Sequence, residues 1–348
     1  MTPTERAAQI AAQAEAAKAD EDLRGALRRT QRALYQEKDR KAAMLQAMHQ
    51  GAFDAFLALG KLPPVKPPRL KADKGRPEVA LWHITDLQGG KRTTTYNLEV
   101  MANRVHQVID KGIKFADIQR HDHPVDNLFI LFGGDMIEGL FNFPRQVFET
   151  DSTIHEQWVT VSHVLVDAVR RALGSFKHVT VVPEWGNHGR IGSKRDAIPL
   201  SDNFDRMCYT FARKVLSMTE PADRLVWQDC PENIQRVEIG EYRALSIHGD
   251  EIGRNGFASP ATIARWANDM RSGACHFPFR DVYVGHYHTN REEAMANGVG
   301  TVFFTGSTES GSLYAMEGLA RGSVPTQRCH FIDPEKGRVT SRYTVWLE

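Results

Sequence analysis

Apolar residues follow two different patterns along the chain, and the change comes near Pro77. From about Thr4 to Leu59 the sequence is rich in Ala, Glu, Lys, Arg, Gln and Leu, with interior breaks at Gly25 and Gly51. Because most of these residues are strong helix formers, the segment predicts one or two long helices. The stretch "KLPPVKPPRLKADKGRP" then follows, and its paired prolines exclude a helix and favour an extended tether.

Beyond Pro77, short β-rich apolar runs alternate with helical stretches, which is typical of an α/β domain. The predicted strands cover residues 78–85, 127–134, 178–186, 243–249, 281–286 and 300–306. Helices are predicted near residues 96–111, 153–173, 201–217 and 260–271. The chain therefore divides into a helical extension (1–60), a Pro-rich basic linker (61–78) and a main domain (79–348).

A sparse apolar seam crosses the predicted N-terminal helices. Its members are Leu23, Leu27, Leu34, Met44 and Met48. Polar residues interrupt the seam at three heptad positions, so it does not predict a continuous coiled coil. Two alternatives stay open: a homo-oligomer formed through the N-terminal helices, and docking of these helices on the main domain.

The composition adds one further feature, an uneven distribution of charge along the chain. The formal net charge is only +1, but residues 24–76 carry 13 basic and 4 acidic side chains, whereas residues 77–348 carry 29 basic and 34 acidic ones. A basic arm on an acidic body suggests contact with a polyanion such as nucleic acid. Exposed lysine and arginine side chains on a solvated helix explain the same charge equally well.

Cysteine usage and the N-terminus indicate a cytoplasmic protein. The four cysteines form no CxxC pair, so neither a thiolate zinc site nor a disulfide framework is predicted. The first residues lack the apolar core of a signal peptide, and no apolar stretch reaches the roughly 18 residues that a membrane span needs. We expect no membrane contact.

Each of the first five apolar runs ends in polar side chains that can bind a metal ion. These are Asp86 and Gln88 in "DLQ", Asp135 and Glu138 in "GGDMIEG", Asn187 and His188 in "WGNHGR", His248 in "IHGDE", and His286 and His288 in "GHYHT". Ligands of open α/β sheets gather beyond the carboxyl ends of the strands, so residues far apart in the sequence can converge there.

Carboxylates, amides and imidazoles without thiolates favour a divalent-metal site. The donors are too many for one ion, which indicates a pair. A carboxylate such as Asp135 can bridge two cations about 3.5–4 Å apart, and such a pair clamps the attacking and leaving oxygens of a phosphoryl displacement. Two such ions carry more positive charge than Asp86 and Asp135 neutralise, which suits an anionic phosphate.

Each motif alone also has an ordinary structural explanation. Asp86 can serve as a helix N-cap, and His248 can be a hydrogen-bonded core histidine. Five such blocks in order, each at the end of a predicted strand, make coincidence a poor explanation.

In this order, the blocks "DLQ", "GDMIE", "GNHG", "IHGD" and "GHYH" resemble the calcineurin-like metallophosphoesterase superfamily over about residues 79–307. The resemblance implies an α/β fold, a metallophosphoesterase-type sandwich of two β-sheets flanked by helices, here with an N-terminal helical extension. It also implies a metal-dependent hydrolase acting on ester bonds, with two divalent ions: Mn²⁺ is expected, and Mg²⁺ or another divalent ion is the alternative.

The resemblance also implies roles for individual residues. The first metal would be surrounded by Asp86, Gln88, Asp135 and His288, and the second by Asp135, Asn187, His248 and His286. His188 corresponds to the catalytic histidine, which faces the phosphate and stabilises or protonates the leaving group. Arg190 lies close enough in sequence for a phosphate contact, with a surface or salt-bridge role as the alternative.

Two positions depart from the family pattern. Gln88 stands where a histidine is usual, and its neutral oxygen should make the first site harder and weaker, favouring Mn²⁺ or Mg²⁺ over Zn²⁺. Gly189 stands where an acid is usual, which removes the carboxylate that would orient His188, so this histidine needs another partner or works less well.

Within the superfamily the chain looks most like SbcD-type and phage-encoded DNA exonucleases, through "GGDMIEG", "GNHG" and "FFTGSTESGS". This implies a DNA nuclease in recombination, repair or phage DNA metabolism, in the host cytoplasm if phage-encoded, and leaves an ATPase partner open. One alternative is a phosphodiesterase or phosphatase acting on cyclic nucleotides or other small molecules. The other is a catalytically weakened binding or scaffold protein.

Overall fold

The computed structural model describes residues 62–70, 75–140, 146–192, 202–252, 258–311 and 324–347, together with residues 21–36 and scattered positions between 6 and 54. The chain divides into two compact units, Met1–Ala58 and Leu59–Glu348.

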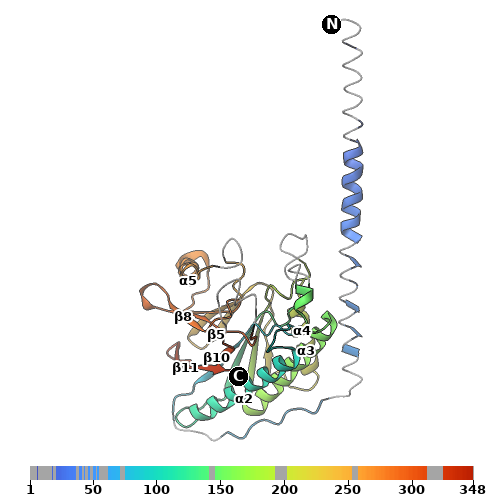
Figure 1. Ribbon diagram of the computed structural model, residues 1–348. Helices are drawn as coiled ribbons and strands as arrows, with labels where there is room; N and C mark the ends of the chain where they lie inside the picture. The colour runs from blue at the N-terminus through green and yellow to red at the C-terminus, as the bar shows by residue number, and fades with distance from the viewer. Residues whose placement is uncertain are drawn as a thin grey trace. The chain divides into compact units, whose positions relative to one another are not determined.

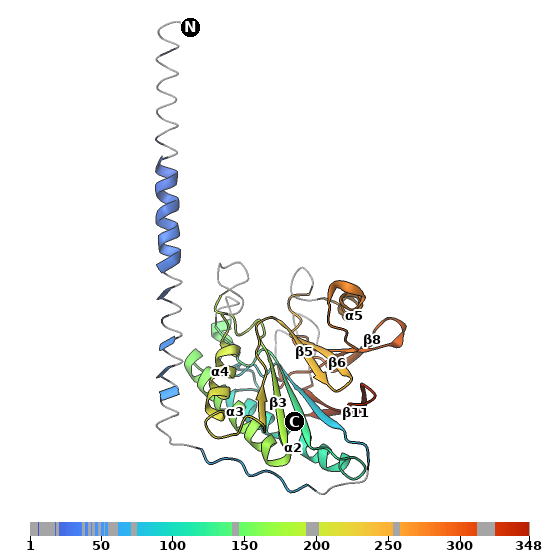
Figure 2. The same cartoon turned by 180° about the vertical axis from the view of Figure 1, so that it is seen from behind.

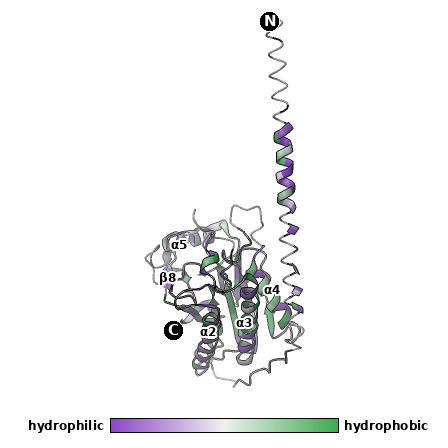
Figure 3. Ribbon diagram, turned by 45° about the vertical axis from the view of Figure 1, so that its right-hand side comes forward, coloured by the Kyte–Doolittle hydropathy of each residue, from purple (hydrophilic) through white to green (hydrophobic). Residues whose placement is uncertain are grey.

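In the first unit, residues 21–36 form a helix, in agreement with their helix-forming composition. Leu23, Leu27 and Leu34 of the apolar seam are between 55% and 69% exposed. In Figure 3 this helix shows mostly hydrophilic colour, interrupted by green. Met44 and Met48 lie outside the described residues, and oligomerisation through the seam stays a prediction.

The second unit contains a six-stranded sheet in the order β11-β10-β1-β2-β3-β4. Its strands are β1 (Val79–Ile84), β2 (Asn127–Gly133), β3 (His178–Glu184), β4 (Leu225–Trp227), β10 (Thr326–Asp333) and β11 (Arg338–Trp346). Strands β1 to β4 run parallel, and β10 and β11 are antiparallel additions beside β1. Both faces of this sheet are covered, so every residue of β1 is buried, including the polar His83.

A second, five-stranded sheet has the order β5-β6-β7-β9-β8. Its strands are β5 (Ile234–Ile239), β6 (Tyr242–Ile247), β7 (Asp281–Val284), β8 (Arg291–Ala294) and β9 (Thr301–Phe304). Strands β6, β7 and β9 are parallel, and β5 and β8 are antiparallel edges.

In the part of the chain that the structure describes, four helices flank the sheets: α2 (Leu98–Gln119), α3 (Ile154–Ser175), α4 (Phe204–Leu216) and α5 (Pro260–Asp269). Helices α2, α3 and α4 lie beside the first sheet, and α5 lies beside β8 and β9 of the second (Figures 1 and 2). An Asn, Thr or Ser side chain caps the N-terminus of each by accepting a backbone N–H. Single helical turns cover Gln146–Glu149, Met270–Ala274 and Ala296–Gly298.

The two sheets pack face to face around a shared apolar core. Leu81, Leu131 and Val182 of the first sheet lie in one cluster with residues of the second, including Tyr242 and Phe303. The predicted α/β sandwich of two sheets flanked by helices is therefore confirmed. Among the residues that the structure describes, no helix is both long and apolar enough to cross a membrane.

The six predicted strands correspond to β1, β2, β3, β6, β7 and β9, but the apolar-run criterion missed the other five. Strand β10 shows why. It is buried along its whole length, yet it contains Gln327, Arg328 and His330. These polar side chains are satisfied by long-range contacts, such as the 2.7 Å ion pair of Arg328 with Glu292, which local sequence does not reveal.

Candidate metal centre

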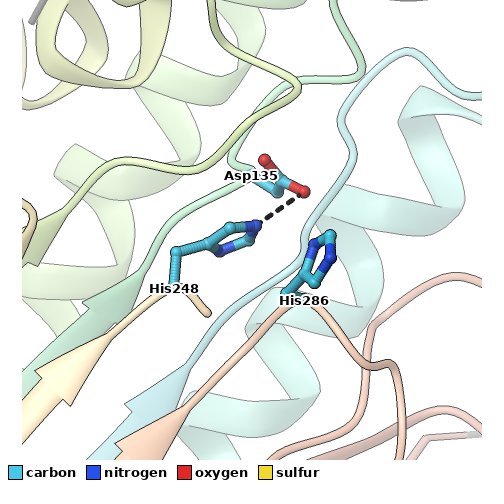
Figure 4. Close-up of side chains that lie close together, drawn as sticks. All are labelled: Asp135, His248 and His286. Carbon is cyan, nitrogen blue, oxygen red and sulfur yellow. Dashed lines mark ion pairs between the residues drawn. The ribbon is translucent and has the colours of Figure 1, made fainter. Parts of the chain in front are cut away.

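The carboxyl ends of parallel strands from both sheets meet at one edge of the sandwich. Asp86, Asp135 and Asn187 follow β1, β2 and β3, while His248 and His286 follow β6 and β7. In Figure 4 the side chains of Asp135, His248 and His286 lie together, although they come from three separate strand ends. The fold thus produces the convergence predicted from the strand order.

Asp135, His248 and His286 form the tightest group of donors. One potential ligand atom from each of these three residues lies within 4.8 Å of those of the others. The Nε2 atom of His248 is 3.1 Å from Oδ2 of Asp135 and 3.1 Å from Oδ1 of Asn187. A carboxylate, an amide oxygen and two imidazoles therefore surround one small volume.

Neighbouring groups fix the orientation of these donors. His248 Nδ1 donates to the carbonyl oxygen of Gly133 at 2.8 Å, which directs Nε2 towards Asp135 and Asn187. Burial lowers the pKa of His248, but the Asp135 carboxylate outweighs burial and raises it well above its ordinary value. In turn, burial raises the pKa of Asp135, but His248 and His188 hold it below the usual range.

A divalent cation fits this group of donors. Asp135 Oδ1 accepts the backbone N–H of His188 at 2.7 Å, whereas Oδ2 faces His248 Nε2 at 3.1 Å. Oδ2 of Asp135 and Nε2 of His248 both carry lone pairs when His248 is neutral, and a shared cation would satisfy both.

A second group joins Asp86, Gln88 and His288. His288 Nε2 is 3.1 Å from Asp86 Oδ1 and 3.1 Å from Gln88 Nε2. The backbone N–H of His286 donates to both oxygens of Asp86, at 3.1 and 2.9 Å, and so links the two groups. The structure brings all seven predicted metal ligands into these two linked groups.

Backbone conformation marks the same residues. Among the described residues, every non-glycine residue with positive φ belongs to the predicted ligand set: Asp86 (54°), Gln88 (44°), Asp135 (54°), His286 (64°) and His288 (48°). The left-handed region is uncommon for such residues, and backbone strain clusters at functional sites. This coincidence argues against the alternative of an N-cap for Asp86.

Glycines make room for the donors. A Cβ atom on Gly186 would lie 2.0 Å from Asp135 Oδ1. Gly134 has a φ of +88°, and a Cβ atom there would lie 2.6 Å from the backbone nitrogen of Gly186. The loops after β2 and β3 can approach this closely only because these positions lack side chains.

His188 lies next to the first group and has a carboxylate partner. Its Nδ1 atom is 3.2 Å from Glu138 Oε2 and 3.0 Å from the backbone oxygen of Glu138. Burial lowers the pKa of His188, but Glu138 and Asp135 outweigh burial and raise it to about 9. Glu138 therefore supplies the carboxylate that Gly189 does not. An acid at position 189 would not fit, because a Cβ atom there would lie 2.2 Å from Asn203 Oδ1.

Arg190 is paired within the protein. It is 4% exposed, and its Nη2 atom lies 2.7 Å from Asp250 Oδ2 and 3.0 Å from Glu251 Oε1. This is the salt-bridge alternative that the sequence left open, and a phosphate contact by Arg190 stays a prediction.

Asp205, at the start of α4, holds together two loops of the candidate centre. The sequence motifs did not indicate this role. Its carboxylate accepts the backbone N–H groups of Asp135 at 2.9 Å, Met136 at 3.0 Å and Gly186 at 2.9 Å. It thereby joins the loop after β2 to the loop after β3. The only local signal is Asn203, which caps α4 two residues earlier.

Lys91 and Glu309 are two further residues near the candidate centre that the sequence motifs did not indicate. Both are buried, and the Lys91 Nζ atom is 3.5 Å from Glu309 Oε1 and 3.9 Å from Glu138 Oε2. Glu309 Oε2 is also 3.3 Å from His288 Nδ1. Burial raises the pKa of Glu309, but the hydrogen bond from His288 and the Lys91 charge outweigh it and lower the pKa to about 2.

Together, fold and side chains define an α/β sandwich protein with a candidate divalent-metal centre at its strand ends. No protein-family model matches the chain, and no curated protein matches it.

Several solved structures resemble the chain at low identity. An archaeal phosphodiesterase is 12% identical, with a TM-score of 0.37, over 76% of this chain and 99% of that one. Vacuolar protein sorting 29 from Cryptosporidium parvum is 12% identical, with a TM-score of 0.34, over 77% and 97%. A predicted phosphoesterase from Streptococcus pneumoniae is 13% identical, with a TM-score of 0.31, over 77% and 98%. Likenesses this remote assign no activity to the chain.

Proposed function

We propose that the protein is a two-metal-dependent phosphoesterase that hydrolyses phosphodiester bonds, and that it acts on DNA as a nuclease of the exonuclease type. The observation that carries this proposal is the convergence of seven oxygen and nitrogen donors, with His188 beside them, at one edge of the sandwich.

The donors divide into two sets that share Asp135. Asp86, Gln88, Asp135 and His288 would hold one ion, and Asp135, Asn187, His248 and His286 would hold the other. Mn²⁺ suits such oxygen and imidazole donors. When bound, the ions supply positive charge at the phosphate oxygens and make a bound water more acidic.

His188 is placed to hold a proton for the leaving group. Its Nδ1 atom is engaged by Glu138, while Nε2 lies 4.0 Å from Asp135 Oδ2 and so faces the metal centre. Because nearby carboxylates raise its pKa to about 9, the imidazole carries a proton at neutral pH in the absence of metal. Delivery of that proton from Nε2 to the departing oxygen is general acid catalysis.

The basic arm supports DNA as the substrate. Residues 24–76 carry 13 basic and 4 acidic side chains. Arg28, Arg29 and Arg32 are exposed on the helix of residues 21–36. Such side chains bind phosphates without regard to sequence, with an affinity that salt weakens. Exonuclease action follows from the family resemblance alone.

The test uses the full chain with Mn²⁺ or Mg²⁺. Linear single-stranded and double-stranded DNA, a closed circular DNA, a cyclic nucleotide and chromogenic phosphate mono- and diesters are supplied separately. We expect degradation of linear DNA, sparing of the closed circle, and loss of activity in His188→Ala.

Three outcomes would contradict parts of the proposal. Cyclic-nucleotide turnover with intact DNA would replace the nuclease by a small-molecule phosphodiesterase. Cleavage of the closed circle would indicate an endonuclease. Inactivity on every substrate, with metal occupancy demonstrated, would favour a binding or scaffold protein.

A further inference from the structure

A buried lysine lies beside the half of the candidate centre that contains Gln88. Lys91 is 8% exposed, and its Nζ atom lies 3.3 Å from Gln88 Oε1, 3.5 Å from Glu309 Oε1 and 3.9 Å from Glu138 Oε2. Two carboxylates and an amide oxygen face its ammonium group, an arrangement that holds the positive charge in place. No motif in the sequence assigns this lysine a role.

Lys91 determines which way the Gln88 amide faces. An ammonium group donates hydrogen bonds and cannot accept them, so only the oxygen of Gln88 can face Lys91 Nζ. The NH₂ group then points to His288, whose Nε2 atom lies 3.1 Å from Gln88 Nε2. The oxygen is the one amide atom that can bind a hard cation, and in Gln88 it is engaged by Lys91.

The other half of the centre is arranged differently. There the amide oxygen of Asn187 faces His248 Nε2 at 3.1 Å, and His248 in turn faces Asp135 Oδ2 at 3.1 Å. Oxygen and nitrogen donors therefore point into a common volume. The half with Gln88 instead presents an NH₂ group to His288 and has a fixed cation in contact with the amide.

We propose that Lys91 makes the two metal positions unequal. The position formed by Asp135, Asn187, His248 and His286 binds a divalent ion tightly. At the other position, Lys91 lowers the affinity by repelling the ion and holding the Gln88 oxygen, while its ammonium group supplies part of the positive charge there. This inference rests on the metal centre of the proposed function and adds a residue that sets how many ions it holds tightly.

Lys91 also connects the two histidines that carry carboxylate partners. Glu138 contacts Nδ1 of His188, and Glu309 contacts Nδ1 of His288. The single positive charge of Lys91 offsets part of the negative charge of these two carboxylates, so they add less to the attraction of a second ion. Removing the lysine charge should increase that attraction.

The experiment is calorimetric titration of the full, metal-free chain with Mn²⁺ alone, without substrate. We expect the wild type to bind one ion tightly and a second at least about tenfold more weakly, since a unit charge in contact with the site opposes the second ion. In Lys91→Met the second step should tighten by about tenfold or more, with the first little changed. Lys91→Arg keeps the charge and should keep the weak second step.

Lys177→Met is the matched control. Lys177 is also ion-paired, at 2.6 Å from Asp126 Oδ2, but belongs to the loop between α3 and β3. The control removes the same charge and should leave both steps unchanged. If Lys91→Met does not fold, as judged by its thermal unfolding, Lys91→Gln removes the charge while keeping a hydrogen-bond donor.

The outcomes separate this inference from the proposed function. Two equally tight ions in the wild type, or a weak second step that neither neutral variant tightens, would overturn the role of Lys91 and leave a two-metal enzyme intact. No bound ion in the wild type would overturn both.

Discussion

The Nδ1 atom of His188 lies 3.2 Å from Oε2 of Glu138, a residue 50 positions earlier in the chain. This contact resolves the departure at Gly189, because the loop after β2 supplies the carboxylate that the loop after β3 lacks room for. Glu138 orients the imidazole and stabilises its protonated form.

We therefore expect Glu138→Gln to lower kcat about 10–100-fold, the usual cost of losing a carboxylate that orients a functional side chain. The tight Mn²⁺ step in calorimetry should be unchanged, because Glu138 is outside the ligand set. Glu138→Asp should restore part of the activity. The exposed Glu241→Gln is the control. An equal loss of Mn²⁺ affinity would mean that Glu138 shapes the metal centre instead of serving His188.

Asp135 is the shared member of both donor sets, so its replacement should abolish metal binding. A ligand at about 100 times its Kd stabilises a protein by about 2.7 kcal/mol, which corresponds to roughly 5 °C or more in Tm. We expect Mn²⁺ to raise the Tm of the wild type by this amount and a chelator to reverse it. Asp135→Asn should show no rise, whereas Asp126→Asn should behave as the wild type. A full rise in Asp135→Asn would remove Asp135 from the centre.

The sequence reveals the candidate metal ligands more readily than the groups that support them. Asp86, Asp135 and Asn187 are recognisable because each follows an apolar strand, and local sequence reveals such strands. Lys91 and Glu309 lack that signal. Their importance arises from an ion pair that joins residues 218 positions apart, after β1 of one sheet and β9 of the other, which come together only when the two sheets pack against each other.

Gln88→His should tighten the weaker metal position and shift its preference towards Zn²⁺. An imidazole offers a softer donor than an amide, and it removes the oxygen that Lys91 now holds. Calorimetry with Mn²⁺ and with Zn²⁺ measures both effects. Unchanged affinity and selectivity would show that Gln88 does not bind metal.

Asp205→Asn should destabilise the fold as well as the centre. The carboxylate accepts four backbone N–H groups of the two loops, and an Asn NH₂ group would face at least one of them. Hydrogen bonds to charged groups contribute about 1.5–3 kcal/mol each, so we expect a loss of about 2–3 kcal/mol in urea unfolding. The exposed Asp202→Asn, three residues earlier, should cost little. Equal stability of the two variants would contradict the bridging role of Asp205.

The basic arm gives a prediction that does not depend on catalysis. Each phosphate contact adds about 0.9 to the steepness with which log affinity falls with log salt. We expect the triple variant Arg28→Gln, Arg29→Gln and Arg32→Gln to bind DNA more weakly and with a shallower slope. Deletion of residues 1–76, which removes all 13 basic side chains of the arm, should flatten the slope further. Fluorescence anisotropy with a labelled duplex, measured without divalent ions, separates binding from cleavage.

The control is Arg338→Gln, at an exposed position on β11 of the second unit. If neither the triple variant nor the deletion changed the affinity or the slope, the arm would have no part in binding DNA, and its charge would belong to a solvated helix.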